Sequence, residues 1–233
     1  MATLLDALYE AFFLILTADA EVLAIVWRSL EVTTLALLIS TVIGIPLGTW
    51  FALTDLPFKR VLTAIIYTGM GLPPVVVGLA VYLLLSRQGP WGDWQWLFTV
   101  PAMVLAQTII ATPVIIGVTL SSVLGVDPDL RPQLEALGAT RWQTTVAILT
   151  EARFGVIVGM VAGFGSIISE VGAVMLVGGN IDGSTRVLTT AIVLETRRGN
   201  FDLALALGII LLAISFLANF VMVLLQGRAM IPR

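Results

Sequence analysis

Long apolar segments dominate this chain and restrict it to a membrane fold. A helix needs about 20 mainly apolar residues to cross a bilayer. Segments that meet this length cover about 22–54, 61–86, 97–122, 154–177 and 201–226. Only 12% of the residues are charged, whereas a soluble domain carries about 25%. The sequence therefore predicts an all-α integral membrane protein with five spans in a single transmembrane domain, 1–233.

The N-terminal segment is apolar but shorter than a span. Within residues 2–17, Asp6 and Glu10 lie four positions apart on one helical face, which is typical of a helix that lies in the membrane interface. We expect an N-terminal interfacial helix over 1–20; six spans is the alternative. Asp19 is predicted to cap a second helix that begins at Ala20.

The second predicted span contains helix breakers. Gly69-Met-Gly-Leu-Pro-Pro74 combines two glycines with two prolines, and the backbone groups freed there must be satisfied by protein or water. Broken helices of this kind often line a transport pathway, so Pro73 and Pro74 are candidate pathway residues. A merely kinked helix is the alternative.

Residues 178–200 are too polar for a span, although they contain the apolar run Val-Leu-Thr-Thr-Ala-Ile-Val-Leu. We expect an extracytoplasmic loop with a short re-entrant or interfacial helix. The preceding span carries Gly155-x-x-x-Gly159-x-x-x-Gly163, a small-residue stripe that permits close helix packing.

A polar, helix-patterned loop covers residues 127–153 and is predicted to form two helices. Asp129 suits the N-cap of the first helix, and Gly138 is a natural end for it. Thr140 with Gln143 three residues later is a capping box that begins the second helix, which we expect to run on toward the next span. A cytoplasmic loop that is helical for no further reason is the alternative.

Missing residue types exclude several chemistries. The chain has no Cys and no His, which excludes disulfides, thiolate sites, imidazole-ligated metals and a His general base. Its single lysine, Lys59, is not part of a phosphate-binding loop, so the chain cannot hydrolyse ATP by such a loop of its own. The net charge of −3 argues against binding nucleic acid. We expect no metal or cofactor on this chain.

The distribution of cations predicts the orientation. With the 127–153 loop in the cytoplasm, the inside holds Lys59, Arg60, Arg131, Arg141, Arg153, Arg228 and Arg233. The outside then holds Arg28, Arg87, Arg186, Arg197 and Arg198. Seven cations against five agrees with the positive-inside rule.

The sequence Glu135-Ala-Leu-Gly-Ala-Thr-Arg-Trp142 resembles the EAA loop with which permeases of binding-protein-dependent ABC importers contact their ATPase. Where the family usually has its glutamate this chain has Pro132, so the contact of that glutamate is not carried over. Thr150-Glu151 replaces the usual Leu-Pro end of the loop. The ATPase-coupling residues that the resemblance implies are Leu134, Glu135, Ala136, Leu137, Gly138, Ala139, Arg141 and Trp142.

Further segments of the sequence resemble one subfamily of these permeases more closely than the others. Residues 168–181, 185–192 and 194–196 closely resemble the permeases of tungstate importers, as do 71–78 and 82–86, which are also similar to molybdate permeases. The resemblance implies the type I ABC importer permease fold in a prokaryotic inner membrane. Its implied partners are a second copy, two ATPase subunits that hold ATP and Mg²⁺, and an extracytoplasmic oxyanion-binding protein. Tungstate is the implied cargo; molybdate, then sulfate, are the alternatives.

Several polar residues near the outer half of the spans are candidates for the pathway. Glu170 must face protein or water because a carboxylate facing lipid is costly; we expect a structural partner, Arg186 or the 178–181 backbone, with a gate as the alternative. The hydroxyls that are candidate donors to an oxyanion, or ordinary packing residues, are Ser166, Ser169, Thr189 and Thr190. The cations that suit an outer mouth, or docking of the binding protein, are Arg186, Arg197 and Arg198.

Two other function classes have less support. A channel or ion-coupled secondary transporter usually has a paired carboxylate within a span, and Glu170 is the single candidate. A membrane enzyme needs a clustered acid, base or nucleophile, and without His or Cys only Glu170 with Ser166 and Ser169 is left.

Overall fold

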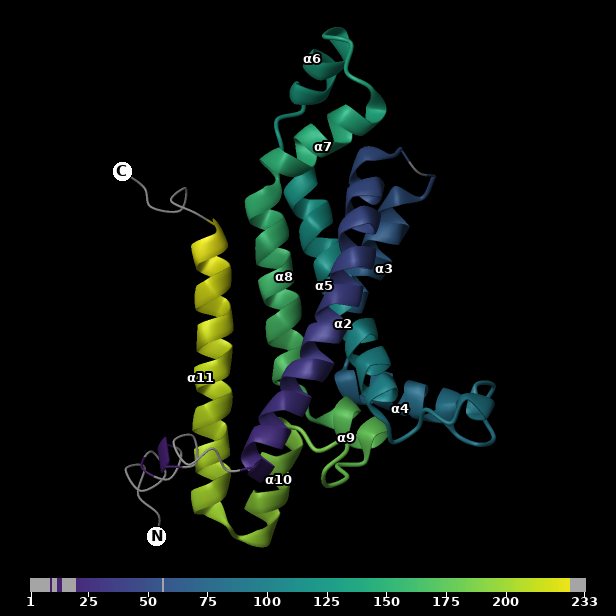
Figure 1. Ribbon diagram of the computed structural model, residues 1–233. Helices are drawn as coiled ribbons and strands as arrows, with labels where there is room; N and C mark the ends of the chain where they lie inside the picture. The colour runs from purple at the N-terminus through teal and green to yellow at the C-terminus, as the bar shows by residue number, and fades with distance from the viewer. Residues whose placement is uncertain (1–8, 10–11, 14–19, 56, 227–233) are drawn as a thin grey trace.

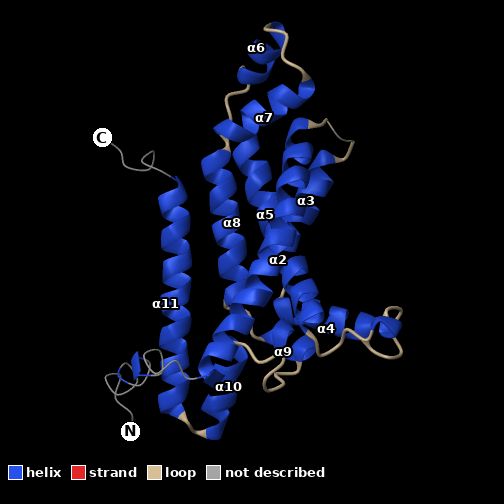
Figure 2. Ribbon diagram, viewed as in Figure 1, coloured by secondary structure: helices blue, strands red, loops and turns tan. Residues whose placement is uncertain are grey.

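The computed structural model describes residues 9, 12–13, 20–55 and 57–226, and these residues form helices and loops without a strand (Figures 1 and 2). The all-α prediction is confirmed. Helix α2 begins at Ala20, as predicted. The predicted interfacial helix over 1–20 lies almost entirely outside the described residues, together with Asp6, Glu10 and the Asp19 cap.

Hydropathy located the membrane-crossing helices well. The single helices that are long and apolar enough to span are α2 (Ala20–Leu53), α5 (Val100–Leu124) and α11 (Phe201–Gln226). Two bent pairs qualify if each is taken as one span: α3 (Lys59–Met70) with α4 (Pro74–Leu85), and α7 (Arg141–Glu151) with α8 (Arg153–Ile168). The described residues therefore contain three to five spans, which accommodates the five predicted.

The second predicted span is broken, so the alternative of a kinked helix is wrong. Helices α3 and α4 meet at an angle of 94°, and α4 leaves the body of the molecule sideways in Figure 1. Pro74 is the first residue of α4, where its missing N–H leaves no intrahelical hydrogen bond unmade. The Leu-Pro-Pro sequence thus ends one helix and begins another.

The fourth span is not the single helix 154–177 that hydropathy predicts. Helix α8 ends at Ile168, and the short α9 (Gly172–Gly178) follows the linker 169–171. At its other end α8 meets α7 at an angle of 68°, so the second helix of the 127–153 loop stops at Glu151 and leads toward the span across a bend at Ala152. Apolar residues flank the linker 169–171 on both sides, which is why hydropathy averaged over the length of a span does not register the break between α8 and α9.

Helix α5 lies at the centre of the bundle and packs against α2, α3, α4, α8 and α9. Glycines allow its closest neighbours to approach: a Cβ at Gly48 of α2 would lie 2.7 Å from the Ile116 carbonyl oxygen, and one at Gly163 of α8 would lie 3.0 Å from Cγ1 of Ile115. The predicted small-residue stripe of the fourth span therefore packs on α5.

A second core joins α10 (Leu188–Arg198) to α11 and the start of α2. Leu188 and Leu207 are buried there. The predicted short helix within 178–200 is α10. The remaining described elements are the 3-10 helix η1 (Gly92–Trp94) and α6 (Leu130–Ala136).

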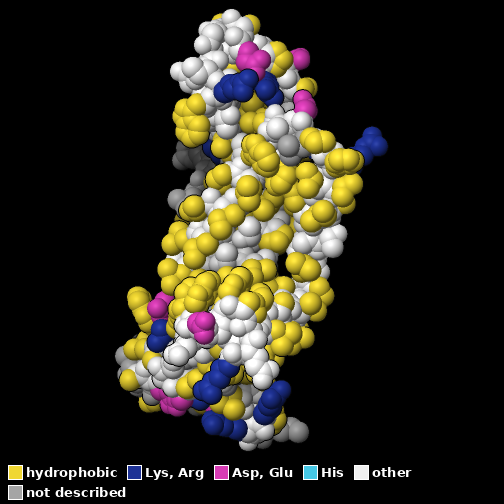
Figure 3. Space-filling model, turned by 90° about the vertical axis from the view of Figure 1, so that its right-hand side faces the viewer, with side chains coloured by type: hydrophobic (Ala, Val, Ile, Leu, Met, Phe, Trp, Pro, Cys, Tyr) yellow, Lys and Arg dark blue, Asp and Glu magenta, His cyan; other side chains and the backbone are white. Residues whose placement is uncertain are grey.

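The surface separates into an apolar middle and two charged ends. In Figure 3, Lys, Arg, Asp and Glu side chains gather at the two ends of the molecule, and the wide zone between them is mostly apolar. One charged end carries the 127–153 loop, and the opposite end carries α9 and α10 (Figure 1). This arrangement fits a chain that crosses a bilayer lengthwise.

Candidate functional site: the 127–153 loop, the outer charged cluster and the α8–α9 break

Local hydrogen bonds fix the shape of the 127–153 loop. The Thr140 Oγ1 accepts from the Gln143 backbone N–H at 3.3 Å, and Gln143 Oε1 accepts from the Thr140 N–H at 2.8 Å, which confirms the capping box. Gly138 has a φ of +84°, the left-handed conformation that glycine adopts without strain. Asp129 occupies the N-cap of α6 but makes no side-chain cap; Asp127 Oδ1 accepts its N–H instead, at 2.9 Å.

The tip of this loop presents apolar side chains to the outside. Leu137 is 85% exposed and Trp142 is 75% exposed, while Leu134 is half-buried. Large apolar groups among charged ones at an exposed tip are typical of a docking surface. The predicted coupling residues therefore lie together on one accessible surface, where Glu135, Ala136 and Gly138 are exposed as well, with Ala139 partly exposed and Arg141 exposed.

Arg131 connects this loop to the end of α2, a contact that was not predicted. Its Nη1 donates to the Leu53 carbonyl oxygen at 3.0 Å, and its Nε pairs with Glu135 Oε1 at 3.0 Å. Lys59 Nζ donates to the carbonyl oxygens of Ala52 at 3.0 Å and Thr54 at 3.2 Å. Two cations thus satisfy carbonyl groups that the end of a helix leaves free.

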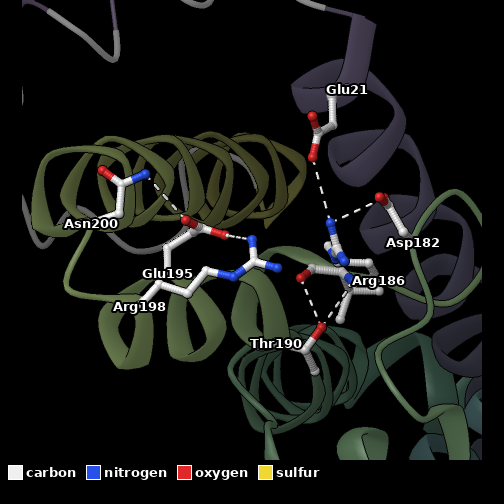
Figure 4. A network of polar contacts seen from close by, with 8 residues as sticks. Glu21, Asp182, Arg186, Thr190, Glu195, Arg198 and Asn200 are labelled. Atoms are coloured by element: carbon white, nitrogen blue, oxygen red, sulfur yellow. Dashed lines mark hydrogen bonds and ion pairs between the residues drawn. The ribbon is translucent and has the colours of Figure 1, made fainter.

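At the opposite end, carboxylates hold two of the three arginines predicted at the outer mouth (Figure 4). Arg186 Nη1 lies 3.0 Å from Asp182 Oδ1 and 3.5 Å from Glu21 Oε1, and its side chain is only 11% exposed. Arg198 Nη1 lies 2.8 Å from Glu195 Oε1. Arg197 is exposed and makes no ion pair with the described residues. Their attraction for a dianion is therefore partly offset by neighbouring negative charge.

Asn200 completes the second of these groups, because its Nδ2 donates to Glu195 Oε2 at 3.2 Å (Figure 4). Glu195 is 8% exposed and joins α10 to the turn before α11. A buried carboxylate with two donors is well compensated. We assign it to the architecture of the α10–α11 corner.

Glu170 caps α9. Its Oε1 accepts from the Ala173 N–H at 2.9 Å. The predicted partners, Arg186 and the 178–181 backbone, are therefore wrong, although the partner is structural in kind. The first N–H groups of a helix have no acceptor within the helix, and the carboxylate satisfies one of them.

The candidate hydroxyls all donate to the backbone. Thr189 Oγ1 donates to the Glu170 carbonyl oxygen at 3.0 Å, and Thr190 Oγ1 donates to the Val187 carbonyl oxygen at 3.0 Å. Both threonines are buried. Ser166 and Ser169 donate to carbonyl oxygens of their own helix, and Ser169 is exposed.

The two broken spans touch each other. Helix α4 packs against α9, and a Cβ at Gly78 would lie 2.5 Å from the Ala173 Cα. Pro73 is exposed and Pro74 half-buried where α4 begins. The α4–α9 contact therefore brings the helix that begins at Pro74 next to the helix that follows Glu170. Arg197 and Arg198 lie on a different helix, α10.

Gln107 is a buried polar residue that the sequence reasoning missed. It lies on α5, is 4% exposed, and donates through Nε2 to the Ile167 carbonyl oxygen at 3.1 Å. It is the single amide side chain in the apolar α5, and such a residue within a membrane segment usually forms an interhelical hydrogen bond. That isolation in the sequence was the available signal.

Comparison with known families decides the class of this chain. The family described as "Binding-protein-dependent transport system inner membrane component" matches residues 44–230. The chain belongs to this family. It is therefore a permease of a binding-protein-dependent ABC importer and a multi-pass membrane protein.

Relatives of this permease carry more specific names. A "Probable anion ABC transporter permease protein" of Haloferax volcanii is 47% identical over 80% of this chain and 82% of its own length. The "Tungstate uptake system permease protein TupB" of Peptoclostridium acidaminophilum is 37% identical over 97% of this chain and 99% of its own length. The "Molybdenum transport system permease protein ModB" of Escherichia coli K12 is 32% identical over 70% and 75%.

Solved structures support the fold. A chain from a bacterial ABC transporter that imports alginate superposes with a TM-score of 0.76, covering 94% of this permease and 83% of itself at 20% identity. The type I ABC importer permease fold is thus confirmed.

Proposed function

We propose that this permease belongs to a tungstate importer. Two copies form the pathway, a separate ATPase docks on the 127–153 loop, and an extracytoplasmic binding protein delivers the oxyanion. The observation that carries the cargo assignment is the 37% identity to a tungstate permease over 97% of the chain. The exposed Leu137 and Trp142 support the docking surface, and the cation count supports its cytoplasmic placement.

The contacts of the loop suggest how an ATPase would drive it. Helix α6 would seat in the ATPase with Leu137 and Trp142 as apolar contacts. Closure of the ATPase dimer would bring the two loops together and tilt α8 and α11, because α7 leads directly into α8. This is alternating access by rigid-body motion.

A permease must release its cargo, so weak donors suit its pathway better than a tight binding site. Ser169 is exposed at the α8–α9 break, and its hydroxyl would contact an anion by exchanging the Gly165 carbonyl oxygen that it now donates to. Discrimination between anions would then reside in the binding protein.

Molybdate is the second candidate cargo, favoured by the 32% identity to a molybdenum permease. Tungstate and molybdate are both tetrahedral dianions, so a pathway lined by hydroxyls would not separate them. The test below therefore compares the anions directly, with sulfate as the third.

The test measures ATP hydrolysis and anion uptake by the reconstituted complex of this permease, its ATPase and its binding protein. Tungstate-loaded binding protein should stimulate both more than molybdate- or sulfate-loaded protein. Equal stimulation by molybdate would reassign the cargo. Uptake that needs no ATP would refute the importer mechanism and favour an ion-coupled transporter or channel.

Two glycine variants separate docking from backbone strain. Gly138 and Gly183 both have positive φ, +84° and +65°, and an added Cβ would meet nothing within 4 Å at either. Aspartate therefore introduces similar strain at both. Gly138→Asp should abolish copurification of the ATPase, and Gly183→Asp should retain it. Retention in both variants would remove the docking role of the loop.

A further inference from the structure

The α8–α9 break leaves backbone groups to be satisfied inside the apolar part of the molecule. In a continuous helix the Val171 N–H would donate to the Ile167 carbonyl oxygen. Here that oxygen accepts from the Glu170 N–H at 3.2 Å and from Gln107 Nε2 at 3.1 Å. Free backbone groups at membrane depth are tolerated only where such substitutes exist.

Side chains from separate helices supply the substitutes. Gln107 comes from α5, and Thr189 comes from α10 and donates to the Glu170 carbonyl oxygen at 3.0 Å. Glu170 itself holds the Ala173 N–H at 2.9 Å. Side-chain hydrogen bonds therefore hold both sides of the break, and they can exchange partners without any change in covalent structure.

The amide of Gln107 is only partly hydrogen-bonded, which is unfavourable for a purely structural residue. Its Nε2 has a partner, but its buried Oε1 has none among the described residues. A half-satisfied buried amide is less stable than an apolar residue of the same shape. The amide borders a small space, also lined by Ser29, Thr33 and Thr189. Its volume of about 10 Å³ is close to the least that one water molecule needs.

The elements on the two sides of the break belong to different parts of the molecule. Helix α8 follows α7 and the 127–153 loop, whereas α9 packs against α4 at the opposite end. Movement of the loop relative to α4 and α9 would concentrate at the linker 169–171, beside Gln107. The Ile167 carbonyl oxygen has one backbone donor and one side-chain donor there, so an exchange of donors would not leave this oxygen unpaired.

We propose that Gln107 is a positioning residue that holds the break open in one state of the transport cycle and releases it in the other. In the bent state its Nε2 and the Glu170 N–H share the Ile167 carbonyl oxygen; in the straightened state the Val171 N–H replaces both donors. The amide then turns toward the Ser29 and Thr33 hydroxyls. This mechanism rests on the proposed function, because it places a step within alternating access.

The first test uses the assembled importer with Gln107→Met, which keeps the length of the side chain and removes the donor. Thr119→Val is the matched control, because Thr119 is on the same helix, is fully buried, and its hydroxyl has no partner within the part of the chain that the structure describes. Loss of one buried hydrogen bond should shift the hinge equilibrium by about tenfold. The amount of tungstate moved per ATP should fall accordingly in Gln107→Met and stay unchanged in Thr119→Val.

A spectroscopic readout separates positioning from general destabilisation. The chain has no cysteine, so spin labels can be placed at Val158 on α8 and Leu83 on α4, which are 46% and 57% exposed. The otherwise unchanged permease should show different label distances with and without ATP. Gln107→Met should change the ratio of the two distances by about tenfold in favour of the straightened state.

Two results would overturn the mechanism. In the first, Gln107→Met moves the normal amount of tungstate per ATP; in the second, it shows both spin-label distances in the same proportions as the otherwise unchanged permease. If Gln107→Met does not assemble, the same measurements on Thr189→Val decide, because it removes the other contact to the linker; unchanged distances there also refute the idea. A complex that changes its label distances but moves no tungstate would refute the proposed cargo and leave the hinge standing.

Discussion

The contact between α4 and α9 offers a sharp test of how the broken spans are held. A Cβ at Gly78 would lie 2.5 Å from the Cα of Ala173 and 3.2 Å from its carbonyl oxygen. Both are backbone atoms, so a side-chain rotation cannot relieve the clash and the helices must separate. Overpacking of this kind costs about 1–3 kcal/mol. We therefore expect Gly78→Ala to lower the melting temperature by about 2–10 °C for a chain of this size.

The matched control is Gly165→Ala. Gly165 lies within α8, and an added Cβ would meet nothing within 4 Å. Alanine should therefore stabilise that helix by about 0.5–1 kcal/mol. Thermal unfolding of both variants in the same detergent, followed by circular dichroism, measures the difference. If Gly78→Ala melts at or above the temperature of Gly165→Ala, the two helices are not packed as described.

Three further changes probe the site. Thr140→Ala removes the capping box and should destabilise the 127–153 loop by about 1 kcal/mol, seen as faster hydrogen exchange in α7. Glu170→Gln keeps an acceptor for the Ala173 N–H and should transport normally, whereas Glu170→Ala should not; equal loss in both would favour a charged gate. Arg131→Met frees the Leu53 carbonyl and should lower stability by less than about 1 kcal/mol, yet reduce uptake per ATP; an unchanged ratio would remove the link to α2.

Features that depend on neighbouring residues could be predicted from the sequence. The capping box of α7 and the glycine end of α6 involve residues within a few positions of one another, and both are confirmed. The apolar spans were also located, because lipid selects composition over a whole helix. Even the break at Pro73–Pro74 follows from local chemistry.

Features set by distant contacts could not be predicted. The end of α8 depends on Gln107, which is 60 residues away from Ile167, and the loop anchor joins Arg131 to Leu53 across 78 residues. The partner of Glu170, the Ala173 N–H, is close in the sequence. It could not be predicted because the sequence did not show that α9 begins at Gly172. The sequence pointed to Glu170 without indicating what it contacts, and it did not single out Gln107.

Helix α2 has a mechanical consequence. It is one uninterrupted helix of 34 residues, about 51 Å long. One end receives Arg131 from the loop that we propose as the ATPase contact, and at the other end the Ser29 hydroxyl accepts from the Leu188 N–H at 2.8 Å. Between Leu53 and Ser29 the helix is about 36 Å long, so a tilt of about 5° at one membrane face becomes a shift of about 3 Å at the Ser29 contact. Nucleotide binding on one side of the bilayer would thus be felt directly at the start of α10 on the other.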